Sequence, residues 1–129
     1  MKDLEKIGKE IVDAAYQVHS TLGPGLLENS YEACLLHELT LRGISVESQV
    51  ELPISYKDHQ IPVGYRLDLL VEKQIIIELK AVDLLWTIHK AQILTYLKLT
   101  GCTLGYLINF NVPLIKDGLR RIVLNHPST

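Results

Sequence analysis

Two apolar segments separated by a short polar break most constrain the fold of this chain. Residues 64–71 read Gly-Tyr-Arg-Leu-Asp-Leu-Leu-Val, and residues 74–80 read Gln-Ile-Ile-Ile-Glu-Leu-Lys, with only Glu72 and Lys73 between them. Runs of β-branched and large apolar residues around such a break predict two antiparallel strands joined by a tight turn. The continuous apolar run at residues 75–77 predicts a strand covered on both faces, as in a sheet that lies between helices.

Each of these predicted strands carries a carboxylate. Asp68 and Glu78 each stand five residues from Lys73, so a turn centred there makes them cross-strand neighbours on one face. Like charges in that position destabilise a hairpin, and their burial costs more unless a cation compensates. Lys80 points to the same face, because it lies two residues beyond Glu78. The pattern predicts a patch that holds a divalent cation. The alternatives are that the acids are edge residues that reach solvent, or that they form structural ion pairs with Arg66 or Lys80.

The rest of the chain predicts a single α/β domain over residues 1–129. Apolar residues at helical spacing predict helices over about residues 3–20, 27–42 and 87–100. Strands are expected at residues 46–56, 61–71, 74–80, 103–110 and 119–124, with a turn at residues 57–60. The inward stripe of the second helix is expected to contain Leu27, Tyr31, Cys34, Leu35 and Leu39. The expected fold is a mixed sheet flanked by helices.

Charge and composition limit the kinds of partner. The 129 residues carry a formal net charge of -2, so a nucleic acid would have to be held by a local basic patch or by a metal ion. Cys34 and Cys102 lack metal-ligand spacing and are expected to be reduced, core-facing thiols. The chain shows neither a signal peptide nor an apolar run of about 20 residues. A cytoplasmic location and no membrane partner are therefore expected.

The helix expected at residues 87–100 carries a polar stripe. His89, Gln92 and Tyr96 fall within one sector of the helix. A short connection joins this helix to the strand that ends at Lys80, so its first turns are expected near the open end of that strand. His89 is expected in a surface or supporting role, whereas Gln92 and Tyr96 are either site residues or an ordinary polar helix face.

These residues suit phosphodiester hydrolysis. The reaction needs an ion that polarises the phosphate and acidifies water, and acids that hold this ion. Mg²⁺ and Mn²⁺ prefer oxygen ligands, which Asp68, Glu78 and the carbonyl of Leu79 supply. Lys80 is placed to orient water or stabilise developing negative charge. Glu28 could add a third carboxylate, or it could be an acid that the helix dipole favours in a first turn.

The same residues resemble a known group of nucleases. Residues 64–68 followed by Glu78-Leu79-Lys80 resemble the PD-(D/E)XK nuclease signature, with Leu67-Asp68 in place of the usual Pro-Asp. Residues 92–96 match the QxxxY element of the RecB-like branch, and residues 25–28 match its GxxE element. With Tyr31 added, the second string reads GxxExxY, which names a family of small proteins. The resemblance extends over about residues 7–123.

The resemblance implies a restriction-endonuclease-like αβββαβ core with an extra N-terminal helix. It also implies Mg²⁺- or Mn²⁺-dependent cleavage of nucleic acid, with DNA expected ahead of RNA. The implied site has Asp68 and Glu78 as metal ligands and Lys80 as the catalytic lysine, with further roles for Glu28, Gln92 and Tyr96. Glu28 would support the metal or its water, and the other two would contact the phosphate backbone or order the site.

Other functions stay open. A nuclease-fold module that binds nucleic acid or a partner protein without cutting is the main alternative, because the chain has no extra targeting domain and no net positive charge. Residues 84–86 (Leu-Leu-Trp) are expected to form a core or homodimer contact, with base stacking on Trp86 as a minor alternative. Arg120 and Arg121 are expected on a solvated edge strand, with contact of this pair and Lys116 to phosphates as the alternative. His19 is expected to be a helix-end cation or to approach Glu28.

Overall fold

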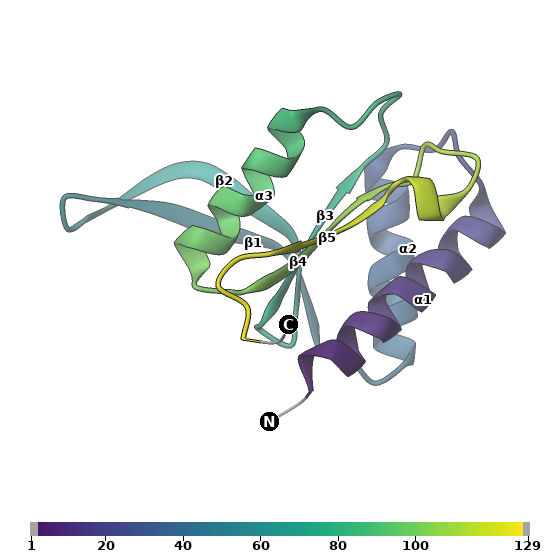
Figure 1. The fold of residues 1–129 in the computed structure, drawn as a ribbon, viewed down its shortest axis with the longest axis horizontal. Helices are drawn as coiled ribbons and strands as arrows, with labels where there is room; N and C mark the ends of the chain where they lie inside the picture. The colour runs from purple at the N-terminus through teal and green to yellow at the C-terminus, as the bar shows by residue number, and fades with distance from the viewer. Residues whose placement is uncertain (1–2, 128–129) are drawn as a thin grey trace.

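The computed structural model describes residues 3–127 (Figure 1). Its elements are α1 (Leu4–Leu22), α2 (Glu28–Leu41), β1 (Val46–Tyr56), β2 (His59–Val71), β3 (Ile75–Lys80), α3 (Thr87–Thr100), β4 (Leu104–Asn109), the 3₁₀ helix η1 (Ile115–Asp117) and β5 (Leu119–Val123). The expected order of helices and strands is confirmed, and η1 is the one addition among the described residues. No helix in this part of the chain is long and apolar enough to cross a membrane.

The five strands form one mixed sheet in the order β1-β2-β3-β4-β5. The pair β3–β4 is parallel, with α3 as the crossover, and the other pairs are antiparallel. Helices α1 and α2 cover one face and α3 covers the other (Figure 1). Along β3, Ile75 and Ile77 pack toward α1 and α2, and Ile76 packs toward α3. The apolar run is continuous because both faces of this strand are buried, and the predicted α/β fold is confirmed.

The hairpin of β2 and β3 has the predicted register. Leu69 pairs with Ile77 and Val71 with Ile75, which leaves residues 72–74 as the connection. Glu72 and Lys73 have positive φ, 51° and 57°, and the amide of Gln74 donates to the carbonyl of Val71 at 2.9 Å, as in a type I′ turn. This turn matches the right-handed twist of the strands, so it fixes which side chains of β2 and β3 share a face.

Both strands of the first hairpin change faces near Asp68. Leu69 packs in the core under α1 and α2, but Leu67 packs in the core under α3, although residues two apart in a strand normally share a face. Gln49, which stands opposite Asp68 on β1, has a φ of 53°. The kink lets the two strands leave the sheet and extend as the long arm in Figure 1. A second irregularity follows at Pro53, where the register of β1 shifts, as expected for an edge-strand proline.

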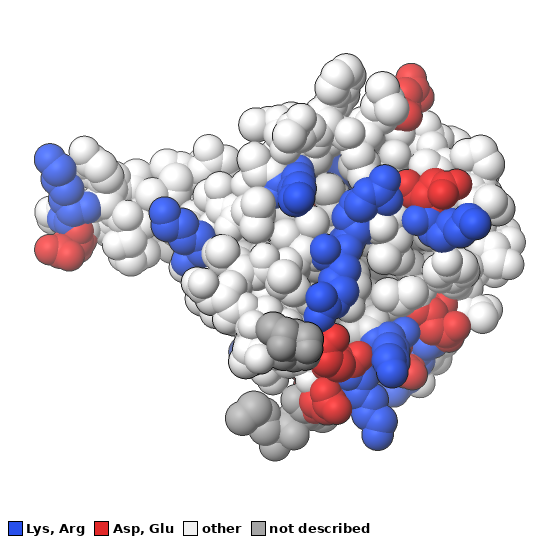
Figure 2. All heavy atoms as spheres, viewed as in Figure 1, with Lys and Arg blue, Asp and Glu red and all other residues white. Residues whose placement is uncertain are grey.

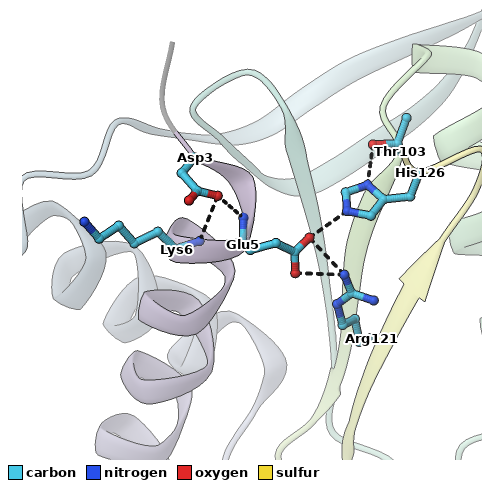
Figure 3. A network of polar contacts seen from close by, with 6 residues as sticks. All are labelled: Asp3, Glu5, Lys6, Thr103, Arg121 and His126. Carbon is cyan, nitrogen blue, oxygen red and sulfur yellow. Dashed lines mark hydrogen bonds and ion pairs between the residues drawn. The ribbon is translucent and has the colours of Figure 1, made fainter. Parts of the chain in front are cut away.

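A polar network joins the first helix to the last strand (Figure 3). Glu5 of α1 accepts hydrogen bonds from Arg121 of β5 (2.9 and 3.0 Å) and contacts His126 Nε2 at 2.6 Å. The other ring nitrogen of His126 lies 2.8 Å from the Thr103 hydroxyl. Asp3 caps the start of α1 by accepting from the amide of Glu5. The network holds α1 to the β5 edge of the sheet.

Four positions that were expected to be buried are exposed. Leu27 precedes the first turn of α2 and is largely exposed, and Cys34 faces solvent, because the buried stripe of this helix consists of Tyr31, Leu35 and Leu39. The expected inward position of Leu27 and Cys34 is therefore wrong. Cys102 is half-buried against the α3 core. The core assignment of residues 84–86 is wrong for Leu84 and Trp86, which are exposed, whereas Leu85 packs against that core.

We expect Gly118→Ala to be strongly destabilising. A Cβ at Gly118 would stand 2.1 Å from the carbonyl oxygen of Asn109, and the amide of Asn109 donates to the carbonyl of Gly118 at 2.8 Å. Because the contact is with main chain, β4 and η1 would have to separate, at a cost of about 2 kcal/mol. Urea unfolding measures the loss. Gly101→Ala, at an open left-handed position, is the control and should lose about 1 kcal/mol; equal losses would contradict the packing argument.

Candidate active site

The two predicted carboxylates meet where β2 separates from β3. The regular ladder ends at the Leu69–Ile77 pair, and side chains then replace the main-chain hydrogen bonds. The amide of Asp68 donates to Glu78 Oε1 at 3.1 Å, and the amide of Leu79 donates to Asp68 Oδ2 at 2.9 Å. Each carboxylate thus binds the backbone of the opposite strand. The pair is held on rigid elements, and both acids lie together as the hairpin register predicts.

Burial and mutual repulsion change the protonation of the pair. Glu78 is only 5% exposed. Its burial, with the charge of Asp68 as the next cause, raises the pKa of Glu78 to about 8, and Lys80 partly offsets this rise. Near neutral pH the pair therefore keeps one proton in the absence of a cation. A divalent ion would favour the doubly ionised form and release that proton.

A groove beside the pair brings together the other predicted residues. Its volume is about 460 Å³, and its lining includes Lys80, Gln92 and Tyr96. Burial, followed by the charge of Glu78, raises the pKa of Tyr96, and a hydrogen bond with the Gln92 side chain lowers it. The ring of Tyr65 lies 6.3 Å from that of Tyr96. The C-terminal end of β3 and one side of α3 therefore form a single polar site.

Among residues 3–127, Glu28 forms no hydrogen bond or ion pair with Asp68 or Glu78. It is exposed at the first residue of α2, and its charge, like that of Asp68, raises the pKa of Glu32. Tyr31 has a structural role. Its hydroxyl donates to the carbonyl of Gly23 (2.6 Å) and accepts from the amide of Leu26 (3.1 Å). The tyrosine thus fixes the turn that leads to Glu28, whose own role stays a prediction.

A match over nearly the whole chain identifies its family. A family model described as the PD-(D/E)XK nuclease superfamily matches residues 5–122. The chain belongs to the PD-(D/E)XK nuclease superfamily. A search of curated proteins gave no significant match. The crystal structure of SSO0001 has a similar fold, with a TM-score of 0.51 and 22% sequence identity. The similarity covers 97% of this chain and 61% of that one, so this protein spans less than two thirds of the length of SSO0001.

The superfamily implies a divalent metal, and the oxygen donors of the site fit one. Residues 3–127 contain no group of three or more His, Cys, Asp and Glu side chains that could hold a metal ion. Mg²⁺ does not need such a group, since it is often bound by one or two carboxylates, with water and substrate phosphate completing the shell. Half-buried Asp68 and buried Glu78 form such a pair of carboxylates. Burial and the charge of Asp68 raise the pKa of Glu78, and a bound cation would offset both effects.

Two residues near the pair were not singled out from the sequence. The Gln49 side chain donates to Glu32 at 2.9 and 3.1 Å and to Asp68 Oδ1 at 3.4 Å. Burial raises the pKa of Glu32, and Asp68 and Glu28 add to this. Glu32 was detectable, because it lies one helical turn after Glu28 on the same face. Gln49 gave no sequence signal, since its placement depends on the kink in β1.

Asn109 was also missed as a site residue. It is buried beside Lys80 in the β3–β4 ladder. Its side-chain oxygen accepts from the amides of Val82 (3.1 Å) and Asn111 (3.2 Å), and its nitrogen donates to the carbonyl of Val82 (2.9 Å). The amide of Phe110 donates to the carbonyl of Lys80 (2.9 Å). Asn109 therefore fixes the segment that follows Lys80. In the sequence, the one indication of this role was a single amide side chain within an apolar strand.

Removal of the Asn109 side-chain amide should destabilise the segment that follows Lys80. In Asn109→Ala the amide and carbonyl of half-buried Val82 and the amide of Asn111 lose their partner, which we expect to lower the free energy of unfolding by about 2 kcal/mol. Chemical denaturation measures this effect. Asn111→Ala, which removes a single exposed hydrogen bond to Asp83, serves as the control and should lose less than about 1 kcal/mol. Similar losses of stability in the two variants would show that the hydrogen bonds of Asn109 do not stabilise this segment.

The two histidines considered from the sequence have structural contacts. His19 Nε2 lies 2.7 Å from the carbonyl oxygen of Val112, so this ring fixes the loop after β4. Among the described residues it forms no hydrogen bond or ion pair with Glu28. His89 accepts from the amide of Trp86 through Nδ1 at 3.0 Å, which closes the first turn of α3. The supporting position expected for His89 agrees with this contact.

Proposed function

We propose that this protein is a metal-dependent nuclease that hydrolyses phosphodiester bonds, with DNA as substrate ahead of RNA. The observation that supports it most is the pairing of half-buried Asp68 with buried Glu78, with Lys80 two residues after Glu78 at the end of β3. Membership of the nuclease superfamily supports the proposal. We also assign the chain to the GxxExxY family of the RecB-like branch, on the motifs at residues 25–31 and 92–96, and treat residues 1–129 as one domain.

Each residue of the site has its own role in this proposal. Asp68 and Glu78, with the carbonyl of Leu79, would hold Mg²⁺ or Mn²⁺. When bound, the ion polarises the phosphate and acidifies water. Glu78 would hold the ion as a carboxylate, so binding of the ion would release the proton that the raised pKa of Glu78 retains near neutral pH. Lys80 orients the attacking water or stabilises the charge that develops on the phosphate.

Three further residues support the site. Gln92 and Tyr96, from one side of α3, contact the phosphate backbone from the groove that Lys80 also lines. Glu28, at the start of α2, supports the ion or its water. The hydrogen bonds of Tyr31 that fix the preceding turn limit how far Glu28 can move.

Cleavage assays test the proposal directly. Purified protein is incubated with single- and double-stranded DNA and RNA, in Mg²⁺, Mn²⁺ or EDTA. We expect metal-dependent cleavage that Asp68→Asn lowers at least about 100-fold. Asp58→Asn is the matched control, because Asp58 lies in the exposed turn at the tip of the β1–β2 arm with φ of 66°, which asparagine tolerates. Absence of cleavage with every substrate would remove the nuclease proposal.

A binding or scaffold module without cleavage is the second candidate. It is favoured by the hydrogen bonds of Asp68 and Glu78 to the backbones of β3 and β2, which give both acids a structural part without a metal. Salt-dependent nucleic-acid binding that survives EDTA and Asp68→Ala, together with no cleavage in the assays above, would support this candidate.

A further inference from the structure

A second groove lies on the other side of the start of α3, between this helix and β5. Its volume is about 300 Å³. The lining combines apolar, aromatic and basic side chains, including Leu85, Trp86, Lys90, Arg120, Arg121 and Ile122. The metal-site groove meets the first turns of α3 through Ile88 and His89, so the two grooves adjoin the same helix start.

Trp86 is exposed in a fixed position. The residue is 63% exposed, and exposure of a large apolar side chain to water is unfavourable. Its main chain is held by His89, whose Nδ1 accepts from the Trp86 amide and whose own amide donates to the Trp86 carbonyl. Leu85 packs against the α3 core. The ring is thus presented to the groove by an anchored segment.

The groove has local positive charge in a chain of net charge -2. Figure 2 shows Lys and Arg side chains in a band across the position of β5. Arg120 donates to the carbonyls of Asp117 and Leu119. Among residues 3–127, neither Arg120 nor Lys90 forms an ion pair. Arg121 pairs with Glu5 and stays partly exposed. Two cations beside an open indole are therefore available to an anionic ligand.

We propose that this groove binds a segment of single-stranded nucleic acid, with a base stacked on Trp86 and phosphates at Lys90 and Arg120. An exposed aromatic ring flanked by cations is the arrangement that holds unpaired bases and their backbone. A duplex keeps its bases stacked on one another and leaves no face for the indole. The inference rests on the proposed function and specifies it: a strand held here passes the start of α3 toward Lys80.

Binding measured in EDTA separates this inference from cleavage. A labelled oligothymidylate of about 12 nucleotides is titrated with protein and followed by fluorescence anisotropy. We expect Trp86→Leu to weaken binding about tenfold or more, and Trp86→Tyr to keep most of the affinity, because leucine keeps apolar volume and tyrosine keeps a stacking face. The chain has one Trp, so quenching of its fluorescence by the unlabelled oligonucleotide reports contact with Trp86.

The basic residues have a matched test. Lys90→Gln and Arg120→Gln should each reduce the slope of log affinity against log salt by about 0.7, as expected for loss of one phosphate contact on a single strand. Lys98→Gln, an equal charge change in the last turn of α3, should leave that slope unchanged.

Several results would overturn the inference. Unchanged oligonucleotide affinity in Trp86→Leu, or equal affinity for a duplex of the same sequence, would show that the groove is not a single-strand site. A dimer in sedimentation that Trp86→Leu converts to monomer, with oligonucleotide affinity unaffected, would assign the surface to a second copy of the chain. If the protein cleaves nucleic acid but the Trp86, Lys90 and Arg120 variants bind the oligonucleotide as the wild type does, the nuclease proposal stands and the groove proposal fails. If binding depends on Trp86 but no substrate is cleaved, the groove proposal stands and the nuclease proposal fails.

Discussion

Glu78→Gln should make the metal-free protein more stable at alkaline pH. In the folded protein the pKa of Glu78 is raised to about 8 from the ordinary 4.5. Below pH 4.5 both folded and unfolded forms hold the proton, so the residue has no pH-dependent effect. Between pH 4.5 and 8 the unfolded chain loses the proton first, and the free energy of unfolding falls by up to roughly 1.4 kcal/mol per pH unit. Above pH 8 the loss is complete.

Glutamine reproduces the protonated acid. Its oxygen can accept from the Asp68 amide, as Glu78 Oε1 does, and its nitrogen can donate to the Asp68 carboxylate. We therefore expect the variant to lack the decline between pH 4.5 and 8 and to exceed the wild type by at least about 2 kcal/mol at pH 9. Urea unfolding in EDTA at pH 5, 7 and 9 measures both curves.

The control for this experiment is Glu47→Gln. Glu47 is exposed and pairs with Lys73 at 3.4 Å, so its replacement should change stability by less than about 1 kcal/mol at each pH. Mg²⁺ at pH 9 should stabilise the wild type and leave Glu78→Gln unchanged. Parallel pH curves for wild type and Glu78→Gln would show that the acid is not protonated in the folded protein.

Lys80→Gln should abolish most cleavage while metal binding survives. Lys80 is half-buried at the end of β3 and lines the groove with Gln92 and Tyr96. In the proposed reaction its charge acts on the water or phosphate and not on the ion, so its loss removes transition-state stabilisation. We expect the cleavage rate to fall about 100-fold or more, with Mn²⁺ affinity changed less than about tenfold.

The matched control is Lys73→Gln, since Lys73 lies at the exposed hairpin turn on the same pair of strands. Its cleavage rate should equal that of the wild type. Single-turnover assays separate the chemical step from product release. Loss of Mn²⁺ binding in Lys80→Gln would show that the lysine organises the site instead of acting on substrate; an unchanged rate would remove it from the mechanism.

The sequence predicts the elements well because the chain obeys simple periodicities. The run at residues 75–77 reads as a strand buried on both faces, and β3 is one. The short break at Glu72 and Lys73 sets the hairpin register, which brings Asp68 and Glu78 together. Local pattern and turn geometry are enough for these features, since each depends on residues close in sequence.

Other features depend on contacts between distant segments. Gln49 reaches Asp68 because β1 takes a positive φ at that residue, which no local pattern indicates. Asn109 matters through its bonds to Val82, 27 residues earlier. Trp86 reads as core because it follows two leucines, yet only Leu85 packs inward. An apolar stretch in a connection leaves open which residue is buried until the neighbouring strands are placed.

Calorimetric titration of Mn²⁺ into wild type and Asp68→Ala, repeated at pH 7 in two buffers of different ionisation enthalpy, tests the central claim most directly. The account predicts binding to the wild type, lost in Asp68→Ala, with release of a proton, because Glu78 is protonated near neutral pH without a cation. Equal binding by the two proteins, or no binding by either, would contradict a metal site at the Asp68–Glu78 pair.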